Sequence, residues 1–108
     1  MVNVLDKVQP KNRVQLKQLI DYAFKHNIYD LNFIDTSKIT DMSYLFDNVN
    51  HNFDISCWDV SNVTNTEFMF GHCKQFNCDL SHWNTSKVKD MKDMFKGCNR
   101  LTIPNWYK

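Results

Sequence analysis

Residues 58–70 read WDVSNVTNTEFMF, and closely similar stretches flank them on both sides. Residues 34–46 read IDTSKITDMSYLF, and residues 83–95 read WNTSKVKDMKDMF. The phenylalanines Phe46, Phe70 and Phe95 are therefore 24 and then 25 residues apart, and a serine precedes each of them by nine residues. A period of this length is typical of proteins whose repeats stack into one continuous core. The sequence predicts a stack of three repeats.

The first half of each repeat has apolar residues at the spacing of an amphipathic helix. In the third repeat these residues are Val88, Met91, Met94, Phe95 and Cys98. The earlier repeats show the same stripe, with one polar exception at position 66. Steps of three and one place apolar side chains on one helical face, and the serine ahead of each stripe is a suitable N-cap. We predict a helix of about three turns in each repeat.

The second half of each repeat alternates between apolar and polar residues. Residues 53–57 read FDISC and residues 78–82 read CDLSH, and shorter stretches at 31–34 and 101–103 are similar. Strict alternation favours a strand with one buried face. A helix and a short strand in constant register predict an α/β fold, a solenoid with a parallel sheet on one side and helices on the other.

The two ends of the chain differ from the repeats. Residues 11–27 predict an amphipathic helix, which Pro10 would start and which would cap the first repeat. We therefore divide the single domain into an N-terminal capping helix region, 1–30, and a three-repeat solenoid, 31–108. Trp106 falls in register with Trp58 and Trp83, so the last coil is half built. A homodimer that forms through this C-terminal coil is one option.

Composition excludes some classes of function. The 108 residues are 43% hydrophobic and carry 13 basic and 12 acidic side chains, for a net charge of +1. This balance disfavours binding to nucleic acid or to membrane surfaces, because proteins that bind them usually have an excess of Lys and Arg. No stretch approaches the roughly 18 apolar residues of a membrane span. Residues 1–12 have no apolar signal core, so we expect a cytoplasmic location, with the cell surface as the alternative.

A family resemblance rests on the repeat motif. Residues Trp58 to Thr64, the pairs Met69-Phe70 and Met94-Phe95, and the Asp-Ile/Leu-Ser triplets at 54–56 and 79–81 are similar to the signature of BspA-like leucine-rich-repeat proteins. This resemblance covers about two thirds of the chain. It implies a short leucine-rich-repeat-like solenoid that binds proteins. Members of the family are often bacterial surface adhesins, and the repeat also occurs in viral and protist proteins.

The cysteines and histidines raise the possibility of a metal or a nucleophile. His72, Cys73, Cys78 and His82 lie within eleven residues, which is conceivable spacing for zinc. The register gives a simpler interpretation, because Cys73 and Cys98 occupy the position of Val49 in the first repeat and are expected in the core. Buried thiols are poor nucleophiles. We therefore expect no metal, no cofactor and no enzymatic activity, and we expect the tryptophans to be core residues.

Positions that point away from the predicted core are the candidates for binding. On the strand face these are Asp54, Ser56, Asp79 and Ser81, and on the helix face they are Tyr44 and Phe68. Exposed aromatic side chains at matching positions are typical of binding hot spots. We predict a non-enzymatic protein-binding module that presents a rigid repeat surface. The alternatives are a small phage- or virus-type intracellular inhibitor of a host enzyme and a fragment of a cell-surface adhesin.

Overall fold

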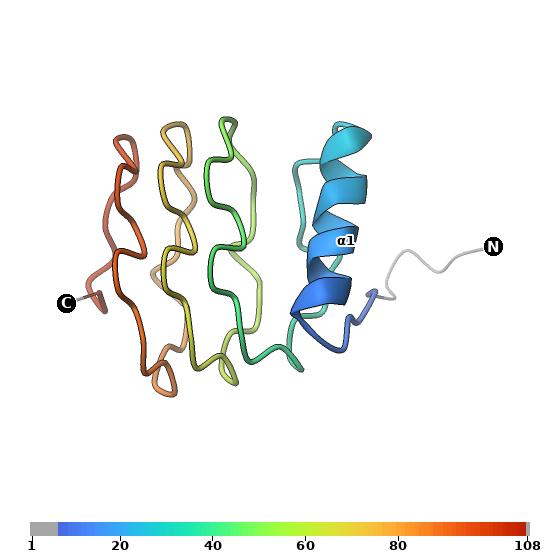
Figure 1. Cartoon of the computed structure of the whole chain (residues 1–108), viewed down its shortest axis with the longest axis horizontal. Coiled ribbons are helices and arrows are strands. Elements are labelled where there is room, and N and C mark those ends of the chain that lie inside the picture. Colours follow the sequence, from blue (N-terminus) through green and yellow to red (C-terminus); the bar gives the residue numbers. More distant parts are fainter. Residues whose placement is uncertain (1–6, 108) are drawn as a thin grey trace.

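The computed structural model describes residues 7–107. Helix α1, Arg13–Lys25, is the only helix in this range, and four isolated parallel bridges take the place of a sheet (Figure 1). After α1 the chain forms three irregular coils, which we define as residues 34–57, 58–82 and 83–107. The predicted boundaries 1–30 and 31–108 include residues 1–6 and 108, which lie outside the described residues.

Helix α1 lies within the range 11–27 that the sequence predicted. The side chain of Asn12 is the N-cap and accepts a hydrogen bond from the Gln15 N–H at 3.0 Å. The buried face consists of Leu16, Ile20 and Ala23, as the apolar spacing requires. The helix lies at one end of the stack of coils, next to the first coil (Figure 1).

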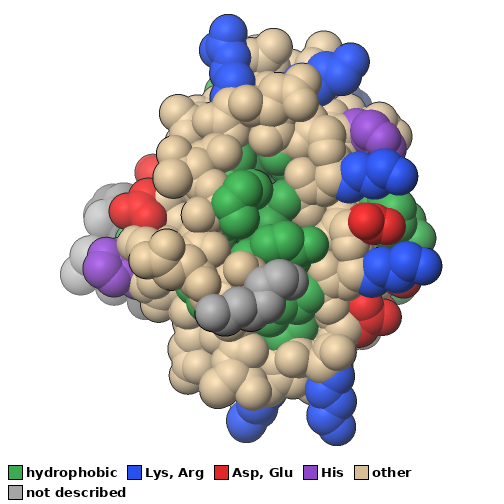
Figure 2. All heavy atoms as spheres, turned by 90° about the vertical axis from the view of Figure 1, so that its left-hand side faces the viewer, with side chains coloured by type: hydrophobic (Ala, Val, Ile, Leu, Met, Phe, Trp, Pro, Cys, Tyr) green, Lys and Arg blue, Asp and Glu red, His purple; other side chains and the backbone are tan. Residues whose placement is uncertain are grey.

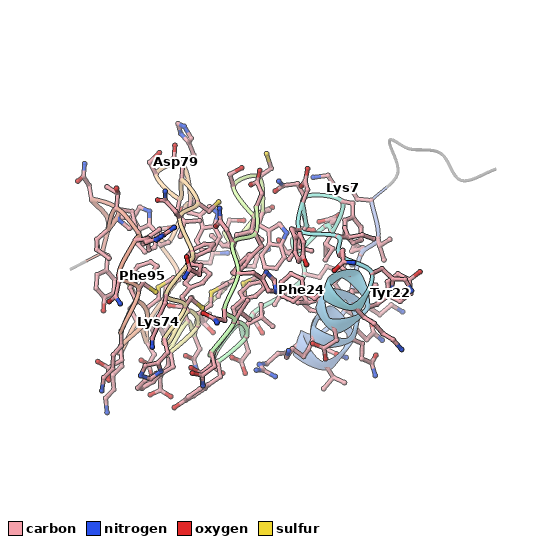
Figure 3. All side chains as sticks on the ribbon, turned by 90° about the horizontal axis from the view of Figure 1, so that it is seen from above. Lys7, Tyr22, Phe24, Lys74, Asp79 and Phe95 are labelled. Atoms are coloured by element: carbon pink, nitrogen blue, oxygen red, sulfur yellow. The ribbon has the colours of Figure 1, made fainter. Side chains whose placement is uncertain are left out.

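Phe24 anchors the helix to the stack. Its ring lies 6.3 Å from the ring of Phe46 and 5.8 Å from that of Phe53, so it extends the core from the coils to α1 (Figure 3). Full burial of a side chain of this size stabilises the folded state by roughly 1.5–3 kcal/mol, and Phe24, which is partly buried, contributes a part of that. The helix is therefore held by apolar packing on the first coil.

The predicted helices inside the repeats are absent, so that part of the fold prediction is wrong. In the third coil the Met94 N–H donates to the Met91 carbonyl and the Cys98 N–H donates to the Phe95 carbonyl, each at 3.1 Å. These bonds span three residues and close separate turns. Left-handed residues lie at two equivalent positions of every coil: Tyr44, Phe68 and Asp93, and Asn48, His72 and Gly97. A right-handed helix cannot continue through such residues.

The predicted strands at 53–57 and 78–82 are also absent, and with them the leucine-rich-repeat-like solenoid of helices and parallel strands. Asp54 forms only an isolated bridge with Asp30. The carboxylate of Asp54 accepts the Ser56 N–H at 2.9 Å, and that of Asp79 accepts the Ser81 N–H at 2.9 Å. Such turns reverse the chain locally. The same turn recurs at Asp30, Asp35, Asp41, Asp59, Asn65, Asn84 and Asp90.

Aromatic rows run through the stack and hold its coils together. The rings of Phe46 and Phe70 are stacked at 5.7 Å and 3°, and those of Phe70 and Phe95 at 5.5 Å and 5°. A second row joins Phe53 to Phe76 at 4.5 Å. Because Phe46, Phe70 and Phe95 are equivalent residues, the 24–25-residue period of the sequence becomes a physical contact between neighbouring coils in the first row.

Trp58 and Trp83 are core residues, as predicted, whereas Trp106 is only half-buried. Trp58 and Trp83 are 4% and 5% exposed. The indole N–H of Trp58 donates to the Leu31 carbonyl at 2.9 Å, and Trp83 and Trp106 make the equivalent bond one repeat further on each time. Each indole thus pairs a buried carbonyl of the preceding unit, which would otherwise be costly to leave without a donor.

Candidate functional site

Tyr44 and Phe68, which we call the aromatic pair, stack on one another at the surface. Their ring centroids lie 5.2 Å apart with the planes inclined by only 7°. Tyr44 is 45% exposed, and the ammonium of Lys96 lies 5.9 Å from the centroid of the Phe68 ring. The structure therefore brings the two predicted aromatic residues together from adjacent coils and adds a cation on the third.

The backbone of the aromatic pair is unusual. Tyr44 has φ 57° and Phe68 has φ 52°, a left-handed conformation that costs a bulky residue about 1–3 kcal/mol. Stacking of the two rings returns only about 0.5–1.5 kcal/mol for the pair. The equivalent residue of the third coil is Asp93, also at φ 52°, and a short polar side chain tolerates this conformation much better. Stacking alone therefore does not offset the backbone strain of two aromatic residues here.

The phenol of Tyr44 stays protonated at neutral pH. Partial desolvation, with the nearby carboxylates of Glu67 and Asp47, raises the pKa of Tyr44 above its ordinary value. The hydroxyl is consequently available as a hydrogen-bond donor at the edge of the aromatic pair.

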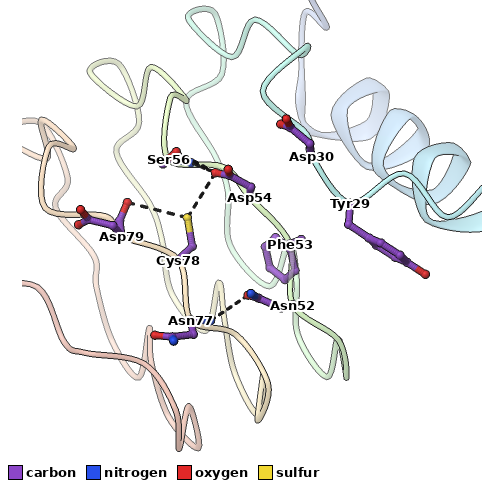
Figure 4. A pocket seen from close by; sticks show the side chains of 9 residues that line it. All are labelled: Tyr29, Asp30, Asn52, Phe53, Asp54, Ser56, Asn77, Cys78 and Asp79. Atoms are coloured by element: carbon purple, nitrogen blue, oxygen red, sulfur yellow. Dashed lines mark hydrogen bonds between the residues drawn. The ribbon is translucent and has the colours of Figure 1, made fainter.

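A groove of about 460 Å³ crosses the turns that Asp30, Asp54 and Asp79 form (Figure 4). Its lining contains Asp54, Ser56 and Asp79 of the predicted binding residues, whereas Ser81 lines an adjacent hollow together with Asp79. The full lining of the groove is Tyr29, Asp30, Asn52, Phe53, Asp54, Ser56, Asn77, Cys78 and Asp79. The predicted polar column thus exists, but it borders two hollows.

The polar groups of the groove are largely committed to the turns. The Asp54 carboxylate accepts the Ser56 N–H at 2.9 Å, the Ser56 hydroxyl at 2.8 Å and the Cys78 thiol at 3.7 Å. Hydrogen bonds from Ser56 lower the pKa of Asp54, and those from Ser81 lower the pKa of Asp79. Both carboxylates are therefore charged at neutral pH, and their first role is to form the turn.

Cys73, Cys78 and Cys98 lie in environments that suppress reactivity, whereas Cys57 is exposed. Burial raises the pKa of Cys78, in the groove, to about 11, and that of Cys73, in the core, to about 12. The Cys73 thiol donates to the Phe46 carbonyl at 2.9 Å, and the Cys98 thiol donates to the Phe70 carbonyl at 3.0 Å. Cys73 and Cys98 are core residues, as the register predicted. Within residues 7–107, no group of three or more His, Cys, Asp or Glu side chains could hold a metal ion.

Two features of these surfaces were not predicted. Phe76 stacks on Phe53, although Cys78 is the residue that begins the equivalent stretch 78–82, and Cys78 is half-buried in the groove. Lys96 lies beside the aromatic pair because the coils bring residues from adjacent repeats into contact. Asn48 and Gly97 occupy the same position in the first and third repeats, and both residue types favour a left-handed backbone. This pattern was the evidence in the sequence against a helix.

Comparison with known proteins gives one family. A search of curated proteins and a search of solved structures each found no match. No helix within residues 7–107 has both the length and the apolar composition needed to cross a membrane. One family profile matches residues 14–107, that is, α1 and all three coils, and is described as "Mycoplasma protein of unknown function, DUF285". The chain therefore belongs to the DUF285 family.

Proposed function

We propose that this chain is a non-enzymatic protein-binding module that recognises its partner through the aromatic pair. The observation that carries the proposal is that Tyr44 and Phe68 stack on one another while both hold a left-handed backbone, which strains an aromatic residue; Tyr44 is 45% exposed and Phe68 is half-buried. Strained residues of this kind concentrate at functional sites.

The aromatic pair has the physical properties of a hot spot. Tyrosine is among the residues most enriched at interface centres, because its ring supplies large contact area and its hydroxyl supplies one directed hydrogen bond. The neighbouring coils fix the backbone of both residues: the Tyr44 N–H donates to the Glu67 carbonyl at 2.9 Å, and the Phe68 N–H donates to the Lys92 carbonyl at 3.0 Å. A surface that is already ordered loses little conformational entropy when a partner binds.

The groove supports the non-enzymatic part of the proposal. Its thiol has a raised pKa and its carboxylates accept hydrogen bonds within their own turns, so neither is prepared for nucleophilic or acid–base work. The similarity of residues 58–64 to the BspA-like leucine-rich-repeat signature is a further argument for protein binding. It is an argument from motif only, since the coils lack the helix and strand of that fold.

A capture experiment with matched variants tests the proposal. The wild-type chain, a double variant Tyr44→Asn/Phe68→Asn and a control Tyr22→Asn are immobilised and exposed to lysate from cells that produce the protein. Asn is chosen because it tolerates the left-handed backbone, and Tyr22 is chosen because it is a 59% exposed tyrosine on α1.

We expect one saturable partner that the wild type and Tyr22→Asn retain and that the double variant loses. Truncation of a hot spot costs at least about 2 kcal/mol, so the Kd should rise about 30-fold or more. Undiminished capture by a folded double variant would contradict the proposal.

A further inference from the structure

Each coil is joined to the next by a fixed set of backbone hydrogen bonds. Four N–H groups at alternate positions of one coil donate to four carbonyls of the following coil, at 2.6–3.0 Å. From the first coil to the second the pairs are Met42 to Asn65, Tyr44 to Glu67, Phe46 to Met69 and Asn48 to Gly71; from the second to the third they are Thr66 to Asp90, Phe68 to Lys92, Phe70 to Met94 and His72 to Lys96. The donors of this segment therefore all face one end of the stack.

The third coil repeats these donors without their acceptors. The equivalent N–H groups belong to Met91, Asp93, Phe95 and Gly97, and none of them donates to any residue between 7 and 107. Next to this segment one bond runs the other way: the Lys89 N–H donates to the Thr64 carbonyl at 2.8 Å. The terminal edge thus presents four backbone donors in a row, with the Lys89 carbonyl as a backbone acceptor beside them.

The same end of the molecule has an apolar centre and a basic surround. Figure 2 shows apolar side chains at the centre of this face and, around its rim, Lys and Arg side chains together with Asp or Glu side chains at the left and right. Ile103 is 45% exposed, and Met91, Trp106 and Tyr107 are half-buried. The third coil carries a net charge of +3, from Lys87, Lys89, Lys92, Lys96 and Arg100 against Asp90 and Asp93, although the whole chain carries only +1.

We propose that this terminal edge binds an acidic segment of another protein, which adds to the stack as a further coil. Carbonyl oxygens of that segment would accept from Met91, Asp93, Phe95 and Gly97, its apolar side chains would cover Ile103 and Trp106, and its carboxylates would meet the basic rim. The proposed interface would use the same backbone hydrogen bonds that join the first coil to the second and the second coil to the third.

A second copy of this chain does not fit the edge. A two-fold pair would bring two rows of donors and two basic rims face to face. A head-to-tail copy would have to offer the outer carbonyls of its first coil, but α1 lies there, and the Nε–H of Arg13 already donates to the Ser43 carbonyl at 2.8 Å. Nucleic acid would contact the basic rim. It would leave the apolar centre uncovered and the row of backbone N–H donors without carbonyl acceptors. The proposal does not depend on the aromatic pair.

The chain itself supplies a suitable probe. A synthetic peptide of residues 59–83 has a net charge of −2 and contains the carbonyls of Asn65, Glu67, Met69 and Gly71, which meet the equivalent donors inside the stack. The peptide, labelled and kept reduced, is titrated with the full chain, with Ile103→Glu, and with Val14→Glu as a matched control at the α1 end, where Val14 is 65% exposed. A scrambled peptide of the same composition is the second control.

Binding is followed by fluorescence anisotropy, and the backbone amides by hydrogen exchange. We expect saturable binding that Ile103→Glu weakens at least tenfold and Val14→Glu leaves unchanged. The amides of Met91, Phe95 and Gly97 should exchange at least tenfold more slowly in the complex. Equal binding of the scrambled peptide, binding without amide protection, or no binding at all would overturn the proposal. So would self-association that Ile103→Glu abolishes, because it would assign the edge to a second copy. Tighter binding of a DNA or RNA oligonucleotide than of the peptide would overturn it too.

Discussion

Replacement of Phe68 by asparagine should leave the stability of the protein within about 1 kcal/mol of wild type. The change removes a left-handed aromatic residue, whose conformation costs about 1–3 kcal/mol, and asparagine adopts that conformation readily. It loses the stack on Tyr44, worth about 0.5–1.5 kcal/mol, and the contact with Lys96, worth about 0.5–1 kcal/mol at an exposed site. Loss of the buried half of the ring costs on the order of a further 1 kcal/mol. The gains and losses nearly cancel.

The comparison with Phe70, two residues away, makes this result informative. Phe70 is fully buried between Phe46 and Phe95, so Phe70→Ala should cost about 3–5 kcal/mol. Urea unfolding, followed by tryptophan fluorescence, would compare the wild type with both variants. If Phe70→Ala is unfolded from the start and shows no urea transition, that result would also agree with this ordering, because small domains are only marginally stable. A loss of 3 kcal/mol or more in Phe68→Asn would refute the reasoning, because the aromatic pair would then be part of the stabilising core.

Variants at three further positions test separate parts of the structure. Asp59→Ala should cost about 1 kcal/mol in urea unfolding and Asp59→Asn much less, because either Asp or Asn can accept the hydrogen bonds of the turn. Hydrogen bonds from Ser61 lower the pKa of Asp59 below 3.8, so the charged carboxylate stabilises the folded state above that pH. This stabilisation is lost as the pH falls further. Asp59→Asn should therefore lose less free energy of unfolding than the wild type below pH 4. Trp58→Phe should cost about 1–3 kcal/mol in thermal or urea unfolding, because the buried Leu31 carbonyl loses its donor. Burial raises the pKa of Cys73 from 9.0 to about 12, so the thiol loses its proton at a lower pH in the unfolded state than in the folded state. The free energy of unfolding therefore falls as the pH rises above 9. Cys73→Ala should make this fall with pH less steep. Equal acid sensitivity of Asp59→Asn, wild-type stability of Trp58→Phe, or an unchanged alkaline slope would each contradict the corresponding assignment.

The repeat register could be read from the sequence because it is a property of side-chain identity. Phe46, Phe70 and Phe95 had to be equivalent for a 24–25-residue period to exist, and they form one stacked row. Helix α1 was predictable for the same reason, since its apolar spacing has a clear start at a polar cap. The core positions of Trp58 and Trp83 followed from register alone.

The local backbone of the repeats could not be read from apolar spacing. Steps of three residues, such as those from Val88 to Met91 to Met94, fit a helix, but they fit a succession of three-residue turns equally well. The distinction depends on φ at positions such as 44 and 68, where aromatic residues give no indication of a left-handed conformation. The alternation of Asp54, Ile55 and Ser56 indicated a strand for a similar reason, because the Asx turn also buries every second side chain.

Native-state hydrogen exchange at three equivalent amides tests the stacking of the coils most directly. The amides of Phe46 and Phe70 donate to the Met69 and Met94 carbonyls at 2.8 and 3.0 Å, whereas the amide of Phe95 donates to no residue between 7 and 107. We predict that the first two exchange only through opening of the stack, at least a hundredfold more slowly than the third in the free protein. Equal exchange rates at all three amides would contradict the account, because the coils would then not be joined by these bonds.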